Sequence, residues 1–254
     1  MYGIAAVKTL VLLLSLALTS AYCAAGVVNP TPSTTCVVLL HGLGRTSLSM
    51  KALQWRLEDA GYGVVNITYP SLAHPVQDLA TIAVEDGLAG CAALQLDRVA
   101  FVTHSLGGIL VRQYLAQNDI PGLQRVVMLG PPNQGSQLAG YLESLVLLEP
   151  FLPRAVGQLG ISEDSIPRRL GRVSFPLGVI AGTVNHLPFL PGQPDGLGDG
   201  TVAVSETLVP GMTDFLELPV SHTFMMWDKD VAEQVIFFLE HGVFNRQSPP
   251  FYAP

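Results

Sequence analysis

Short, continuously apolar runs alternate along the chain with longer segments in which apolar residues recur at helical spacing. A continuous apolar run bounded by turn residues is typical of a strand buried on both faces of a parallel sheet. Such runs predict strands at Cys36–Leu40, Gly63–Tyr69, Val99–Val102, Arg125–Leu129, Phe175–Ala181 and Asp214–Leu218. Helical spacing between and after them predicts helices, the last over Asp230–His241. Strand–helix–strand repeats of this length favour right-handed crossovers, so we expect an α/β fold with about six mostly parallel strands and helices on both faces.

The segment from Gln137 to Arg172 interrupts this alternation. It is partly apolar, and Pro150, Pro153 and Pro167 break any long helix in it. We therefore expect residues 137–172 to form a small cap-like or lid-like excursion across the top of the sheet.

The first 25 residues have the pattern of a cleaved signal peptide. Lys8 precedes the apolar run Thr9–Leu18, and small residues follow at Cys23–Ala25. The run is shorter than the roughly 20 apolar residues that span a membrane. We expect cleavage after Ala25, export to the periplasm or the medium, and a single domain over residues 26–254. A buried helix or an uncleaved membrane anchor is the alternative.

Export changes what the cysteines predict. After removal of Cys23, only Cys36 and Cys91 remain, and an oxidising compartment allows them to pair. Cys36 begins one predicted strand and Cys91 precedes a neighbouring one, at the same end of the sheet. A disulfide between them is the prediction, and two small buried apolar side chains are the alternative.

Composition narrows the function classes. The formal net charge of −7 argues against nucleic acid, which binds a basic surface. The cysteines are too few for a zinc site, and we expect no cofactor and no metal. A calcium ion at Asp195 or Asp199 stays an alternative that nothing in the sequence requires.

Ser105 has the setting of an activated nucleophile. The β-rich run Val99–Val102 is followed by a polar break, by Gly107 and Gly108, and then by a helical pattern. A strained strand-to-helix turn exposes and aims a serine hydroxyl, which is otherwise a weak nucleophile. The usual elbow reads G-x-S-x-G, and here Thr103 stands at the first glycine. The simpler alternative is that Ser105 only caps the helix.

A serine nucleophile needs a histidine as base and a carboxylate to orient that histidine. We expect both at the edge of the sheet where Ser105 lies, because sites in open α/β sheets lie beyond the carboxyl ends of the strands. Of six histidines, His222 alone follows the last predicted strand at that edge. The other five are expected to support loops, cap a helix or lie on the surface: His41, His104, His74, His186 and His241. Asp199, in the loop after the fifth strand, is the favoured acid, and nearby Asp195 is the alternative.

An oxyanion needs two hydrogen-bond donors. The amide of Leu106 follows the nucleophile at a helix N-terminus, where the helix dipole helps. We expect the second donor from Leu43, in the loop after the first strand, where Gly42 and Gly44 allow the amides to turn inward. A phosphate-binding glycine loop is the alternative, although the lysine of such a loop is missing.

Taken together, these stretches resemble the exported bacterial lipases and esterases of the α/β-hydrolase superfamily, and are also similar to GPI-inositol deacylase-like hydrolases. The matching motifs are His41–Gly44, Thr103–Gly108, Gly130–Ser136, Asp199–Val202 and Ser221–Thr223. The resemblance implies a minimal α/β-hydrolase fold and carboxylic-ester hydrolysis through an acyl-enzyme. Ser105 would be the nucleophile, His222 the base and then the acid, Asp199 its orienter, and the Leu43 and Leu106 amides the oxyanion hole.

The substrate is expected to be a small-molecule or lipid ester, with transient contact to a lipid surface left open. We expect an apolar acyl site formed by the 137–172 excursion and by some of Phe224, Met225, Met226 and Trp227, and ordinary core packing is the alternative for those four. Thioester or amide hydrolysis by the same triad, or a non-catalytic lipid-binding protein, are the competing functions.

Overall fold

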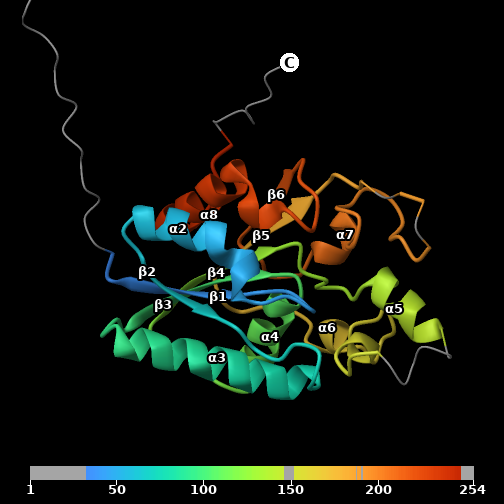
Figure 1. Cartoon of the computed structure of the whole chain (residues 1–254), viewed down its shortest axis with the longest axis horizontal. Coiled ribbons are helices and arrows are strands. Elements are labelled where there is room, and N and C mark those ends of the chain that lie inside the picture. The colour runs from blue at the N-terminus through green and yellow to red at the C-terminus, as the bar shows by residue number, and fades with distance from the viewer. Residues whose placement is uncertain (1–32, 146–151, 187, 190, 247–254) are drawn as a thin grey trace, which may run out of the picture. The chain divides into compact units, whose positions relative to one another are not determined.

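The computed structural model describes residues 33–145, 152–186, 188–189 and 191–246. It contains one sheet of six strands in the order β2-β1-β3-β4-β5-β6, and every neighbouring pair is parallel (Figure 1). The strands are β1 Thr35–Leu40, β2 Gly63–Ile67, β3 Arg98–His104, β4 Leu123–Leu129, β5 Leu177–Gly182 and β6 Asp214–Leu218. The predicted fold class is confirmed. β2 ends two residues before the predicted Tyr69, whose ring instead stacks on His41.

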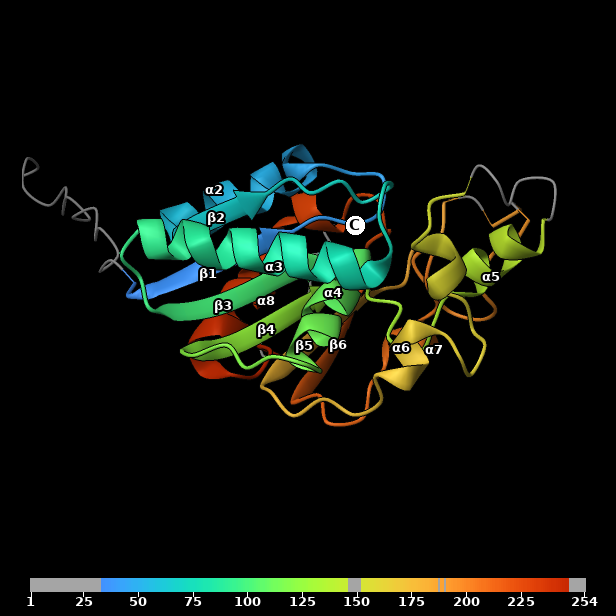
Figure 2. The same cartoon turned by 90° about the horizontal axis from the view of Figure 1, so that it is seen from below.

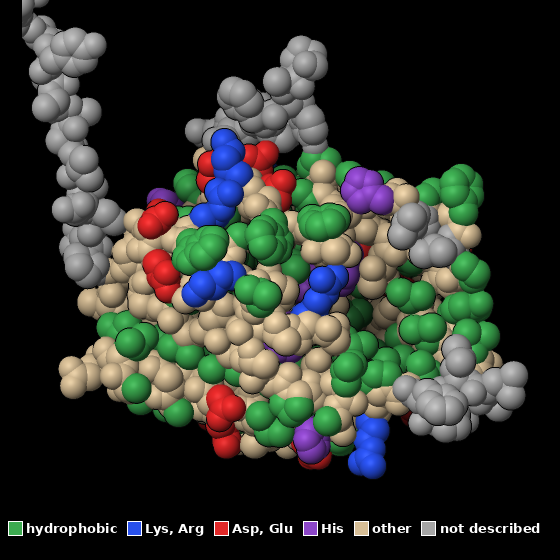
Figure 3. Space-filling view, in the orientation of Figure 1, with side chains coloured by type: hydrophobic (Ala, Val, Ile, Leu, Met, Phe, Trp, Pro, Cys, Tyr) green, Lys and Arg blue, Asp and Glu red, His purple; other side chains and the backbone are tan. Residues whose placement is uncertain are grey.

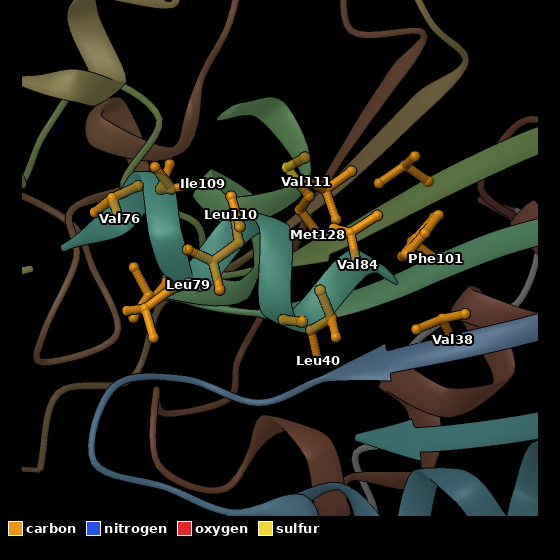
Figure 4. Close-up of a cluster of buried hydrophobic side chains, with 14 of the residues drawn as sticks. Val38, Leu40, Val76, Leu79, Val84, Phe101, Ile109, Leu110, Val111 and Met128 are labelled. Carbon is orange, nitrogen blue, oxygen red and sulfur yellow. The ribbon is translucent and has the colours of Figure 1, made fainter. Parts of the chain in front are cut away.

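Helices cover both faces of the sheet. α2 (Lys51–Asp59) and α8 (Lys229–His241) lie on one face, and α3 (Val76–Ala93) and α4 (Leu106–Leu115) lie on the other (Figures 1 and 2). Side chains alternate along a strand, so Val37 and Leu39 of β1 pack towards α2 and α8, while Val38 and Leu40 pack towards α3 and α4. Figure 4 shows the second of these two cores. Two covered faces explain why the strands are continuously apolar.

The order of the strands places a topological switch point between β1 and β3. The chain moves outward from β1 to β2, then crosses to β3 on the other side of β1. Loops that follow β1 and β3 therefore diverge and leave a crevice beyond the carboxyl ends of these strands, where ligands bind in folds of this type.

The 137–172 excursion adds no strand within its described residues. It contains α5 (Gln137–Ser144), η3 (Val156–Gln158) and α6 (Ile166–Arg169), and these elements lie beyond the carboxyl ends of the strands (Figure 2). Its residues 146–151, which include Pro150, lie outside the described residues. Arg112 of α4 anchors it: the buried guanidinium donates to the carbonyl oxygens of Pro167 and Gly171, at 3.1 and 2.7 Å.

Cys36 and Cys91 form a disulfide with their Cα atoms 5.7 Å apart. Cys91 lies within the last turns of α3, so the bond joins the beginning of β1 to the helix that covers it. The predicted signal peptide lies outside the described residues. Within the described part of the chain, no helix is both long and apolar enough to span a membrane.

Candidate active site

Ser105 lies at the apex of a sharp turn between β3 and α4. Its φ of 53° is positive, a strained conformation for a residue with a side chain. The Ser105 amide donates to the Leu129 carbonyl oxygen at 2.9 Å, which fixes the turn against β4. Gly107 permits it: a Cβ there would lie 2.7 Å from the backbone oxygen of Leu40. Thr103, the departure from the usual elbow, is fully buried within β3.

His222 and Asp199 are directly hydrogen-bonded. His222 Nδ1 lies 2.7 Å from Asp199 Oδ2, and both residues are buried. The other carboxylate oxygen, Oδ1, accepts from the amides of Thr201 and Val202 at 3.0 and 2.8 Å. These two amides hold the carboxylate in place, so that its Oδ2 atom orients the ring of His222 through Nδ1. Asp195, the alternative acid, is exposed and contacts Gln137.

Gly130 is a supporting residue that the sequence analysis did not single out for this role. Its φ is +54°, and a Cβ there would lie 2.9 Å from Asp199 Oδ2 and 3.1 Å from His222 Nδ1. Any side chain would therefore collide with the histidine–aspartate pair. The signal in the sequence was the glycine directly after an apolar strand, which indicates close backbone approach but does not identify the partner.

Ser105 and His222 line one cavity of about 240 Å³, together with Leu43 and Leu106, the two predicted oxyanion donors. The excursion contributes five apolar side chains to the lining of this cavity: Leu138, Ala139, Leu142, Val156 and Leu159. Hydrophobic side chains also gather on the α5 side of the surface shown in Figure 3. The arrangement places a serine, a paired histidine and an apolar wall around one space.

The loop that carries Leu43 is fixed by His41 and Tyr69, whose rings stack with centroids 4.1 Å apart. The Tyr69 hydroxyl donates to the His41 carbonyl oxygen, and the Tyr69 amide donates to His41 Nε2. His41 Nδ1 in turn donates to the Gly42 carbonyl oxygen at 2.8 Å, so the ring is neutral with its proton on Nδ1. Burial lowers the pKa of His41. The predicted support by His41 is confirmed, whereas the part of Tyr69 was missed.

His104 also supports a loop, as predicted: its Nε2 lies 3.0 Å from the His222 carbonyl oxygen. His186 and His241 are exposed, and neither they nor His74 line the cavity.

The expectation that some of residues 224–227 line the acyl site is wrong, and the alternative of ordinary core packing holds for Met225 and Met226. Met225 and Met226 are fully buried between the sheet and α2 and α8. Phe224 and Trp227 are 62% and 52% exposed, and none of the four lines the cavity. The reason is a turn of 3-10 helix, η4 (Met225–Trp227), which directs the two methionines into the core and leaves the aromatic rings outside.

Among the described residues, no group of three or more histidine, cysteine, aspartate or glutamate side chains is arranged to hold a metal ion. Asp195 and Asp199, the pair considered for calcium, differ in exposure, and the carboxylate of Asp199 is occupied by His222 and by two amides.

The fold is shared with several solved enzymes of low sequence identity. A mature lipase of Bacillus licheniformis superposes with a TM-score of 0.62 at 20% identity, over 84% of this chain and 94% of that one. A phospholipase of Legionella pneumophila gives a TM-score of 0.62 at 20% identity, over 83% of this chain and 59% of that one. A metagenomic carboxyl esterase gives 0.58 at 18% identity, over 76% of this chain and 66% of that one.

No curated protein matches the chain in sequence. The model of the alpha/beta hydrolase family, however, matches residues 37–247. The match begins within β1 and includes the other five strands, the serine elbow and the histidine–aspartate pair. The chain belongs to the alpha/beta hydrolase family.

Proposed function

We propose that the protein hydrolyses carboxylic esters through an acyl-enzyme on Ser105, with His222 as the base and Asp199 as its orienting acid. One observation carries the proposal: His222, hydrogen-bonded to Asp199 at 2.7 Å, lines the same cavity as a serine held at a strained elbow. That combination supplies a nucleophile, a base and an orienting group, the three parts that acyl transfer needs.

The reaction would follow from these positions. Asp199 Oδ2 accepts a hydrogen bond from the protonated Nδ1 of His222. Nε2 is therefore unprotonated and free to take the proton of the Ser105 hydroxyl. Ser105 Oγ bonds to the ester carbonyl carbon, and the carbonyl electron pair moves to the oxygen. That oxyanion would accept hydrogen bonds from the amides of Leu43 and Leu106.

Collapse of this intermediate breaks the bond to the alcohol oxygen, which leaves with the proton held by His222. Water then attacks the acyl carbon and gives one proton to His222. Ser105 leaves as the second intermediate collapses, and the same proton returns to its oxygen. The products are a carboxylic acid and an alcohol.

The cavity favours an ester with an apolar acyl group. Its volume of about 240 Å³ is roughly eight times the share of one water in the liquid, about 30 Å³. An acyl chain of several methylenes fits this space, and the apolar side chains of Leu138, Leu142 and Leu159 would contact it. A lipase, a phospholipase and a carboxyl esterase share the fold.

The test is turnover of p-nitrophenyl butyrate by wild type, Ser105→Ala and, as a matched control, Ser162→Ala, which removes an exposed hydroxyl. We expect a loss on the order of 10⁶-fold in kcat for Ser105→Ala and no loss for the control. Equal activity in Ser105→Ala would overturn the mechanism. Labelling of wild type but not of Ser105→Ala by a fluorophosphonate probe would contradict the non-catalytic lipid-binding alternative.

Matched oxygen ester, thioester and amide substrates decide the bond class. We expect the oxygen ester to give the highest kcat/KM. Activity on a long-chain ester that rises above its solubility limit would indicate a lipase acting at a lipid surface. Activity that does not rise there would indicate an esterase.

Export is part of the proposal. The disulfide supports an oxidising compartment, and the N-terminal pattern supports a signal peptide cleaved after Ala25. Mass spectrometry of the protein expressed from residue 1 in a bacterium tests this, because a mature chain beginning at Gly26 is expected in the periplasm or the medium. A membrane-bound chain that retains residues 1–25 would instead identify an anchor.

A further inference from the structure

We propose that His104 is a positioning residue for acyl transfer, holding the backbone of His222 in register with Ser105. The inference rests on the proposed function and concerns a residue beside the triad. His104 is the last residue of β3 and directly precedes Ser105. Its Nε2 lies 3.0 Å from the carbonyl oxygen of His222, a residue 118 positions away in the chain.

The hydrogen bond defines the state of the His104 ring. A carbonyl oxygen only accepts, so Nε2 carries the proton. Nδ1 has no hydrogen-bond partner and faces Gly42, where a Cβ would lie only 2.8 Å away. Burial, reinforced by the nearby His222, lowers the pKa of His104 well below its ordinary value. A proton added at Nδ1 would be buried without an acceptor, so the ring is neutral.

Neutrality matters because the two rings are close, with centroids 4.6 Å apart. During the reaction His222 becomes a cation, and a charged neighbour at this distance would oppose that step. A neutral His104 donates to the His222 backbone without adding a positive charge next to the imidazolium.

The bond also completes the support of the proposed base. The His222 amide donates to the Asp199 carbonyl oxygen at 3.0 Å, and Nδ1 bonds to Asp199 Oδ2. Both of these contacts come from the acid loop. His104 supplies a contact from the end of β3, the strand that leads into Ser105. It therefore links the backbone of the proposed base to the turn that carries the proposed nucleophile. Proton transfer depends on the distance between the Ser105 hydroxyl and the His222 ring. A small misplacement of the ring therefore lowers kcat rather than substrate affinity.

The experiment compares His104→Gln with His104→Met, measured on p-nitrophenyl butyrate. Glutamine and methionine have side chains of similar length, but only the glutamine amide can donate to the His222 carbonyl. Both variants lose the ring, so the difference between them isolates the donor. We expect kcat to fall about 10- to 100-fold in His104→Met with KM within about twofold, by analogy with lost supporting contacts at metal sites. His104→Gln should retain most of the activity, as should the exposed-site control His241→Gln.

Equal losses in the glutamine and methionine variants, or a loss confined to KM, would overturn the proposal. If neither variant folds, NMR of wild type labelled with 15N-histidine decides: a neutral Nε2–H ring at His104 throughout the active pH range supports it, and an Nδ1–H or charged ring overturns it.

Ser105→Ala, assayed in parallel, separates the two levels. If it keeps wild-type activity, the proposed function itself fails. If it is inactive while His104→Met remains near wild type, only the role of His104 fails.

Discussion

Replacing Asp199 by asparagine should abolish catalysis while leaving the fold nearly unchanged. The asparagine oxygen can still accept from the amides of Thr201 and Val202, which now bond to Asp199 Oδ1. Its amide nitrogen then takes the place of Oδ2 and presents donors to His222 Nδ1. To avoid two facing donors, the imidazole must carry its proton on Nε2. In that tautomer it cannot accept the proton of Ser105.

The size of the effect follows from this change of tautomer. Where it has been measured in a serine hydrolase triad, the loss in kcat is about 10⁴-fold, equivalent to about 5 kcal/mol in the activation barrier. The folded state keeps both amide bonds and loses only their charge assistance, so the free energy of unfolding should change by no more than about 2 kcal/mol. Activity and stability are thus expected to separate.

The assay is steady-state hydrolysis of p-nitrophenyl butyrate, with thermal unfolding of the same samples. Asp195→Asn is the matched control, because Asp195 is exposed and its backbone amide, which the substitution keeps, donates to Gln137. It should retain wild-type kcat. More than about a tenth of wild-type activity in Asp199→Asn would refute the role of Asp199 as the orienting acid. An equal loss in Asp195→Asn would also refute the reasoning, and would make Asp195 the candidate acid again.

Three further predictions test other parts of the structure. In Ala139→Phe the larger side chain occupies part of the cavity beside its apolar lining. The value of kcat/KM should therefore fall more for octanoate esters than for acetate esters, and equal falls would argue against an acyl site there. Loss of the disulfide, by replacing Cys36 and Cys91 with alanine, should lower the free energy of unfolding by roughly 4 kcal/mol for a separation of 55 residues, and an unchanged Tm would contradict this. Burial lowers the pKa values of His41 and His104, so below about pH 6.5 the unfolded chain binds more protons than the folded chain. Tm should therefore decrease as the pH is lowered from about 7.5 to about 5.5. A Tm that rises over this interval would show that other groups dominate.

The sequence by itself determined the elements and the edge of the sheet where the candidate site lies. Continuous apolar runs indicated strands covered on both faces, and these strands have the predicted order along the chain. Local chemistry also marked Ser105, because a strand, a small-residue turn and a helix are all encoded within about ten neighbouring positions. Position after the last strand was enough to select His222, because every parallel strand ends at the same edge.

Only the tertiary structure decided which groups meet at that edge. Asp195 and Asp199 lie in the same glycine-rich loop and have similar sequence neighbours. Asp195 is nevertheless exposed, whereas Asp199 is buried and bonded to His222. Likewise, the close approach of Gly130 to that pair depends on β4 and β5 being neighbours. The bond from His104 to the His222 carbonyl spans 118 residues. Periodicity reports which face of an element is buried, whereas contacts of this kind depend on strand order and register, which are set by packing over the whole sheet.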